Sequence, residues 1–250
     1  MVQRLLKIML LVAACGLFIA NAHATIIVSG DASITRMIST TIPQIYNQGD
    51  QQFFENIVNG STDIAVVNKY GTNLFAGDIN TFYQSLGNVN STLISTITET
   101  SLGNADMLII PVPEDAFSNE EMVLMNSYIN GGGAVFFLGD CSNFSSNNAI
   151  INQTLLGIGS TLSIIDDTLD RGLYTAKGNQ IVGGSNYTNN IQSFNYAFVS
   201  GVSGGNPLFL TTNGTPFISY EQLRSVPEPS MAMLFLISMP ALLLTVRKKR

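Results

Sequence analysis

Three short, unbroken apolar runs, separated by segments with other patterns, restrict what this chain can fold into. The runs read DIAVVN at residues 63–68, DMLIIP at 106–111 and AVFFLG at 134–139. A strand that is apolar at nearly every position is typical of a parallel sheet, in which both faces are covered. The sequence therefore predicts that these three strands are adjacent, parallel and buried, with helices in the right-handed crossovers between them.

The segment before the third run is the clearest helix. Ser118 and Glu121 have the spacing of a capping box, Met125 and Ile129 mark one face, and three glycines at 131–133 end the pattern. Similar patterns predict further helices at 51–60 and 77–87 and further strands at 25–30 and 91–98.

The pattern changes after residue 165, where short runs alternate with Gly, Asn and Pro. Asn213 and Gly214 lie between LFLTT and TPFIS and predict a tight hairpin turn. We expect these strands to add an antiparallel extension to the sheet. The aromatic residues of this region could stack on sugar rings, although half-buried strands more often use such residues as core.

The first 24 residues have the three parts of a secretory signal peptide. Positive charges at Arg4 and Lys7 precede an apolar stretch, and Ala22 and Ala24 form an A-x-A cleavage site. An alternative is a lipoprotein signal, because the residues up to Cys15 resemble a lipobox. The apolar stretch continues beyond Cys15, which favours the ordinary signal peptide.

The carboxyl end combines a rigid motif, an apolar run and a basic cluster. The run at 230–246 carries no charge, and as a helix it would be about 25 Å long, slightly short of a hydrocarbon core of about 30 Å. Basic residues after it can snorkel and would hold the carboxyl end in the cytoplasm, so we expect a transmembrane helix here. The motif is Val226, Pro227, Glu228, Pro229 and Ser230, and the basic tail is Arg247, Lys248, Lys249 and Arg250.

These three parts, in this order, resemble the PEP-CTERM sorting signal of Gram-negative bacteria. Met231 is a mild departure, since Thr or Ala usually follows the serine in that family. The resemblance implies export by the secretion machinery and processing by a transpeptidase-like membrane enzyme, exosortase. Substrates of this kind tend to occur in organisms that make exopolysaccharide and biofilm matrix. The alternative is an ordinary membrane anchor with a chance Pro-Glu-Pro.

The two termini divide the chain into a signal peptide at 1–24, a secreted α/β domain at 25–225 and a sorting signal at 226–250. This organisation predicts a precursor anchored in the inner membrane, followed by a location in the cell envelope, at the surface or in the extracellular matrix. Membrane contact is expected through residues 230–246.

Charge and histidine content exclude several functions for residues 25–225. This segment holds 16 of the chain's 17 Asp and Glu but only five of its 11 Lys and Arg, so its surface repels nucleic acid. The one histidine, His23, lies in the predicted signal peptide. No partner remains for a Ser-His or Cys-His pair and no His ligand for a catalytic zinc, and we expect no cofactor.

The stretch from residue 104 to 140 resembles class I glutamine amidotransferase-like domains, the flavodoxin-like group that includes the ThuA-like proteins, and the resemblance extends over residues 63–165. The likeness lies in the order of elements and apolar positions. It implies an α/β fold with a mostly parallel, flavodoxin-like sheet flanked by helices. Catalytic members carry a nucleophilic Cys in a G-x-C-x-G elbow. Here Gly139 and Cys141 match, Asn143 replaces the second glycine, and the partner His is absent.

Cys141 is the one weak catalytic candidate. It could be a thiolate at a helix amino terminus, with Glu114 or Asp115 as an acidic partner. The alternative, which we favour, is a small buried apolar side chain.

Residues 166–172 are a weak candidate for a calcium loop. The pattern lacks the acidic residue at the twelfth place, where Lys177 stands, and its glycine comes one residue late. We therefore expect a solvated turn and no metal. The candidate ligands are Asp166, Thr168 and Asp170.

Together these features predict an exported, non-catalytic domain with a structural or binding role associated with exopolysaccharide or biofilm matrix. The alternative is a hydrolase or transferase of the amidotransferase-like group that works without His and uses Cys141.

Overall fold

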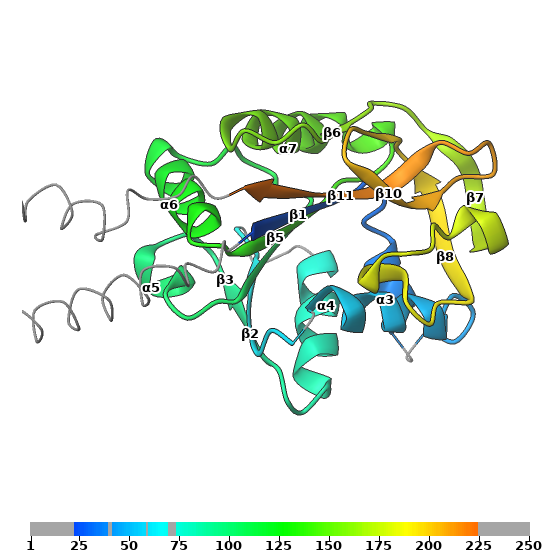
Figure 1. Cartoon of the computed structure of the whole chain (residues 1–250), viewed down its shortest axis with the longest axis horizontal. Helices are drawn as coiled ribbons and strands as arrows, with labels where there is room; N and C mark the ends of the chain where they lie inside the picture. The colour runs from blue at the N-terminus through cyan, green and yellow to red at the C-terminus, as the bar shows by residue number, and fades with distance from the viewer. Residues whose placement is uncertain (1–22, 40–41, 59, 70–73, 225–250) are drawn as a thin grey trace, which may run out of the picture. The chain divides into compact units, whose positions relative to one another are not determined.

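The computed structural model describes residues 23–39, 42–58, 60–69 and 74–224, and residues His23–Leu223 form one compact unit (Figure 1). The helices are α2 (Ile34–Met37), α3 (Gln48–Val58), α4 (Leu74–Ser85), α5 (Glu99–Leu102), α6 (Asn119–Asn130) and α7 (Ser145–Gly157), with 3-10 turns η1 (Ser142–Phe144), η2 (Gly178–Gln180) and η3 (Asn186–Thr188). The strands are β1 (His23–Ser29), β2 (Asp63–Val67), β3 (Asn90–Ile94), β4 (Met107–Pro111), β5 (Ala134–Leu138), β6 (Ser163–Ile164), β7 (Leu169–Lys177), β8 (Ser193–Val199), β9 (Val202–Ser203), β10 (Asn206–Leu210) and β11 (Pro216–Arg224).

A seven-stranded sheet in the order β10-β11-β1-β5-β4-β2-β3 forms the centre. The strands from β1 to β3 in this order pair in parallel, and Ile109 on β4 lies opposite both Phe136 on β5 and Val66 on β2. The prediction that the three apolar runs are adjacent, parallel and buried is therefore confirmed.

The mixed α/β class is also confirmed, but the flavodoxin-like class is not. The parallel strands run in the order 1-5-4-2-3, whereas flavodoxin-like sheets have the order 2-1-3-4-5.

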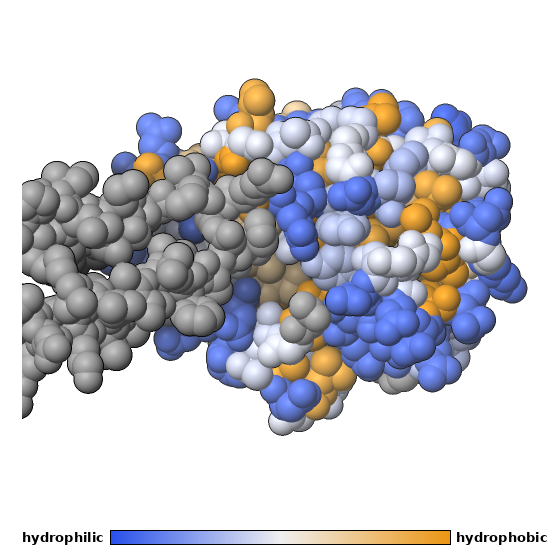
Figure 2. All heavy atoms as spheres, in the orientation of Figure 1, coloured by the Kyte–Doolittle hydropathy of each residue, from blue (hydrophilic) through white to orange (hydrophobic). Residues whose placement is uncertain are grey.

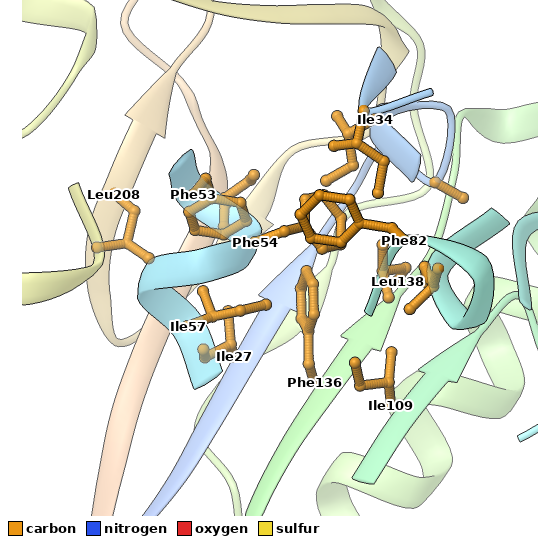
Figure 3. Close-up of a cluster of buried hydrophobic side chains, with 14 of the residues drawn as sticks. Ile27, Ile34, Phe53, Phe54, Ile57, Phe82, Ile109, Phe136, Leu138 and Leu208 are labelled. Atoms are coloured by element: carbon orange, nitrogen blue, oxygen red, sulfur yellow. The ribbon is translucent and has the colours of Figure 1, made fainter. Parts of the chain in front are cut away.

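Side chains of the central strands alternate between two hydrophobic clusters, one on each face of the sheet. On β5, Phe136 and Leu138 contribute to the cluster beneath α3 and α4, whereas Val135 and Phe137 contribute to the cluster beneath α6 and α7. Figure 3 shows Phe136 in the first cluster, close to aromatic rings from α3 and α4. This alternation explains why the strands are apolar at every position, since both faces are covered.

The predicted capping box of α6 is present. The Ser118 hydroxyl accepts from the Glu121 N–H, and the Glu121 carboxylate accepts from the Ser118 N–H. Glu121 also forms an ion pair of 2.8 Å with Lys69, which follows β2, and accepts from the Ile97 N–H. One glutamate therefore connects the start of α6 to two other segments of the chain.

The antiparallel extension is confirmed. β10 and β11 form the predicted hairpin, and Gly214 in its turn has a φ of 81°. β7 and β8 pair as a separate two-stranded sheet, on which Leu173 and Phe198 are about half exposed. Figure 2 shows hydrophobic surface on that side of the unit, among hydrophilic surroundings.

The transmembrane prediction has no support from the described residues. Across the described ranges 23–39, 42–58, 60–69 and 74–224, none of the helices has the length and apolar character needed to cross a bilayer. The apolar run at 230–246 lies outside these ranges.

Candidate functional site

β1 and β5 are neighbours in the sheet, but the chain leaves their carboxyl ends toward opposite faces. β1 leads to α2 and α3, which pack on the Phe136 side, and β5 leads to α7, which packs on the other side. Such a reversal is the topological switch point at which open α/β sheets bind ligands. A Gly-Asp pair follows each strand directly, which places Asp31 after β1 and Asp140 after β5.

Asp31 is fully buried and is held by both local and distant donors. Its Oδ1 accepts from the N–H of Ser33 at 2.8 Å and from the hydroxyl of the same residue. Its Oδ2 accepts from the N–H of Ala197 on β8 at 2.8 Å. The first contacts come from the local turn after β1, whereas the last fixes a strand 166 positions further along the chain.

Asp140 is also buried, and its backbone is fixed from two sides. The Asn148 amide donates to the Asp140 carbonyl at 2.7 Å and accepts from the Asp140 N–H. The Ser200 hydroxyl donates to the same carbonyl at 2.8 Å. The carboxylate of Asp140 accepts from the Cys141 N–H at 2.7 Å.

The two carboxyl groups have strongly shifted proton affinities. Burial raises the pKa of Asp31 to about 7, and the negative charge of Asp140 adds to this effect. Burial raises the pKa of Asp140 to about 6, against the opposing effect of the hydrogen bond from Cys141. Two buried acids with raised pKa values at a switch point are candidates for a general acid and a general base.

The extension nevertheless covers this pair. The backbone of Ser200 lies against Gly30, where a Cβ atom would come within 2.0 Å of the Ser200 carbonyl oxygen. Gly139 is similarly enclosed, since a Cβ there would lie 2.4 Å from both the Asn148 side chain and Ile164. The crevice that would admit a substrate to the two carboxyl groups is therefore filled by residues of this chain.

Cys141 lies at the first turn after β5, as the elbow comparison expected, but its surroundings disfavour a thiolate. The side chain is buried, and its burial raises the pKa of the thiol, to which the charges of Asp140 and Asp31 add. The suggested partners, Glu114 and Asp115, are exposed residues after β4. The carboxyl groups that act on Cys141 are the two buried ones instead.

An open groove lies at the same end of the sheet. It has a volume of about 470 Å³ and collects residues from the segments that follow β1, β2, β4 and β5. Two of its aromatic rings, Phe75 and Phe144, meet edge to face at 6.4 Å. Its lining is Arg36, Leu74, Phe75, Val112, Glu114, Phe144, Ser146 and Asn147.

Val112 in this groove has a strained backbone. Its φ is 41°, a left-handed value that is a rare outlier for a β-branched residue. The conformation is held by a hydrogen bond of 2.7 Å from the Val112 N–H to the Leu138 carbonyl, and by Asn147, which donates to the carbonyl of Pro113. Strain of this kind gathers at binding sites and is retained because the surroundings fix it.

The structure does not assemble the suggested calcium ligands. Asp170 accepts from the Tyr196 hydroxyl and from Thr212, and Thr168 shares a hydrogen bond with Ser142. Asp166 is exposed. Among the residues that the structure describes, no group of three or more His, Cys, Asp or Glu is placed to hold a metal ion.

The targeting residues were predicted from the two ends of the chain. Ala24 lies in β1 and is buried, so cleavage after it would remove the first two residues of that strand. The other targeting residues lie outside the described ranges: Ala22, Val226, Pro227, Glu228, Pro229, Ser230, Arg247, Lys248, Lys249 and Arg250.

Sequence reasoning missed Asp31 and Asp140 as a pair. A signal was present, because the segments IIVSGD and VFFLGD both end an apolar strand with Gly-Asp. Carboxyl ends of parallel strands meet at one edge, so acids that follow two such strands are expected to lie near each other.

No family model matches the chain, and no curated protein matches it. Among solved structures, the chain is similar to one described as "mmIFT52 N-terminal domain", with a TM-score of 0.50 and 13% sequence identity. The similarity covers 70% of this chain and 99% of that one. At this identity the likeness concerns the fold alone.

Proposed function

We propose that residues 25–225 form a non-catalytic binding domain whose ligand site is the groove beside Phe75 and Phe144. The observation that carries the proposal is the contrast between two neighbouring places in the fold. The groove is open and has a strained Val112 in its wall, whereas the carboxyl pair at the switch point is covered. Ligand sites are concave, largely apolar and supplied with a few polar groups, as this groove is.

A carbohydrate fits the lining of the groove best. Aromatic rings give flat apolar surface for a sugar ring, and Ser146 and Asn147 offer neutral hydrogen-bonding groups. Arg36 and Glu114 add one charge of each sign. A ligand from exopolysaccharide would agree with the sorting signal that residues 226–250 resemble, and export, exosortase processing and a cell-envelope location rest on that resemblance.

Binding of the full chain to an array of neutral and acidic oligosaccharides tests this function. Phe144→Ala should weaken binding at least about tenfold, which corresponds to about 1.4 kcal/mol. Leu156→Ala is the matched control, because Leu156 is an exposed apolar side chain on α7 that does not line the groove. Equal binding by the Phe144 variant and the control would remove the groove from the proposal.

The alternative function is a His-independent hydrolase or transferase of the amidotransferase-like group. One observation favours it, namely that Cys141 and Asp140 are adjacent at the switch point. The burial of both groups and the raised pKa of the thiol make this the weaker of the two proposals.

A further inference from the structure

Among the strands that the structure describes, β8 pairs with one partner, along one of its edges. That partner is β7, and on the other side the N–H groups of Asn195 and Ala197 donate to carboxylates. Asp50, in the first turn of α3, accepts from Asn195 at 3.0 Å, and Asp31 accepts from Ala197 at 2.8 Å. Two acidic side chains therefore occupy the place of a neighbouring strand. We call this arrangement the carboxylate clasp of β8.

The acids of the clasp are buried, and among the described residues none of them forms an ion pair. Asp31 and Asp50 have no exposed surface, and Asp140 is 5% exposed. The titratable groups that face Asp31 are Asp140 and Cys141 after β5 and Asp50 on α3. Within the part of the chain that the structure describes, the ion pair is Lys69 with Glu121, which involves none of them.

The strand held by the clasp continues directly into the cover of the switch point. The Ser200 N–H donates to the Gly30 carbonyl at 2.8 Å, and its hydroxyl donates to the carbonyls of Asp140 and Asp167. Gly201 donates to the Asp167 carboxylate. Residues 197–201 therefore connect the clasp to the ends of β1 and β5, so a change in the clasp acts on the cover.

We propose that the protonation of Asp31 controls how firmly β8 and residues 197–201 are docked over the switch point, with the cover tight in mild acid and loosened above neutral pH. When Asp31 and Asp140 are both ionised, two like charges interact in a buried site. A proton on Asp31 removes that repulsion. When the segment is undocked, both carboxyl groups reach water and can ionise without this cost.

The direction follows from linkage. The pKa of Asp31 is about 7 when docked and near its ordinary value of 3.8 when solvated, so the docked state binds the proton more tightly. Docking is therefore favoured most at low pH, below the ordinary value of 3.8, where Asp31 is protonated in both states. That advantage declines as pH rises through the docked pKa. Burial raises the pKa of Asp50 as well, which acts in the same direction.

Amide hydrogen exchange of the full chain at about pH 5.5 and about pH 8 tests the proposal, with each rate corrected for the intrinsic effect of pH. The amides of Asn195, Ala197 and Ser200 should lose at least about tenfold in protection at the higher pH, relative to Ile109 and Phe136 in the central strands. Equal protection ratios at both pH values would overturn the proposal.

Two variants separate the clasp from a general effect of pH. Asp140→Asn keeps an oxygen that can accept from the Cys141 N–H, but it removes the charge that repels ionised Asp31. The loss of amide protection at about pH 8 should therefore be smaller in this variant than in the wild type. Asp31→Asn should strongly reduce the pH dependence at Ala197 and leave only the part that Asp50 contributes. Asp106→Asn is the control, because the pKa of Asp106 is lowered by hydrogen bonds from Thr62 and Asp63 at the other end of the sheet. An unchanged pH dependence in both Asp140→Asn and Asp31→Asn would also overturn the proposal.

Discussion

The carbonyl oxygen of Ser200 lies so close to Gly30 that a Cβ atom at position 30 would come within 2.0 Å of it. The contact is backbone against backbone, so no side chain can turn aside to relieve it. Ser200 also donates its N–H to the Gly30 carbonyl. Only glycine at position 30 allows the extension to close over the end of β1, and this contact gives the first prediction.

Gly30→Ala should lower the free energy of unfolding by about 2–3 kcal/mol, because the cover must move away from β1. Gly77→Ala is the matched control. Gly77 lies in α4 with open space around its Cα, so alanine there should be neutral or stabilising by up to about 1 kcal/mol. Urea unfolding of the full chain measures both. Equal stability of the two variants would contradict the tight contact.

Glu121→Ala should destabilise the fold by about 2–3 kcal/mol, because it removes the carboxylate half of the capping box and the ion pair of the partly buried Lys69. Glu120→Ala, an exposed change in the same turn of α6, should stay within about 0.5 kcal/mol of the wild type. The measurement is the thermal midpoint of each variant. A Glu121 variant as stable as the Glu120 variant would show that the ion pair contributes little.

The same glutamate gives a prediction in acid. Burial raises the pKa of Glu121, but hydrogen bonds from Lys69, Ser118 and Ile97 outweigh it and leave the pKa lowered. A lowered acid pKa adds stability above the ordinary value of 4.5, and this stability is lost as pH falls through the folded pKa. The difference in unfolding free energy between wild type and Glu121→Gln should therefore shrink below about pH 4. A difference that stays constant down to that pH would count against the assignment.

Cys141 should resist a thiol reagent at neutral pH in the folded protein and react at once in denaturant. The reason is that burial and the neighbouring carboxyl groups raise its pKa and hide the sulfur. The absorbance of a disulfide reagent measures the reaction, with the denatured chain as the positive control. Rapid labelling of Cys141 in the native protein would instead support the enzymatic alternative.

The free energy of unfolding should decrease by at least about 2 kcal/mol from about pH 5 to about pH 8. Asp31 and Asp140 have folded pKa values of about 7 and about 6, above the ordinary 3.8, so the folded state binds more protons than the unfolded state in this range. Stability therefore declines as pH rises. Chemical unfolding at several pH values measures the slope, which Asp140→Asn should reduce. A rise in stability over this range would show that the pair is not buried as described.

The sequence by itself determined the central strands and the helix that Ser118 caps. These elements depend on local patterns, such as apolar runs that need two covered faces and a serine placed three residues before a glutamate. The hairpin around Gly214 was predictable for the same reason, since a turn with positive φ requires a residue such as glycine. Local patterns also placed Cys141 just after β5.

The order of the strands and the state of the candidate site were decided only by the tertiary structure. Asp31 meets Ala197 across 166 positions, and Asp170, read in the sequence as part of a loop, instead binds Tyr196 and Thr212. Local periodicity carries no information about such contacts. Whether an acid is solvated or buried, and whether a crevice is open or covered, depends on which distant backbone packs against it, because burial and neighbouring charge set its pKa.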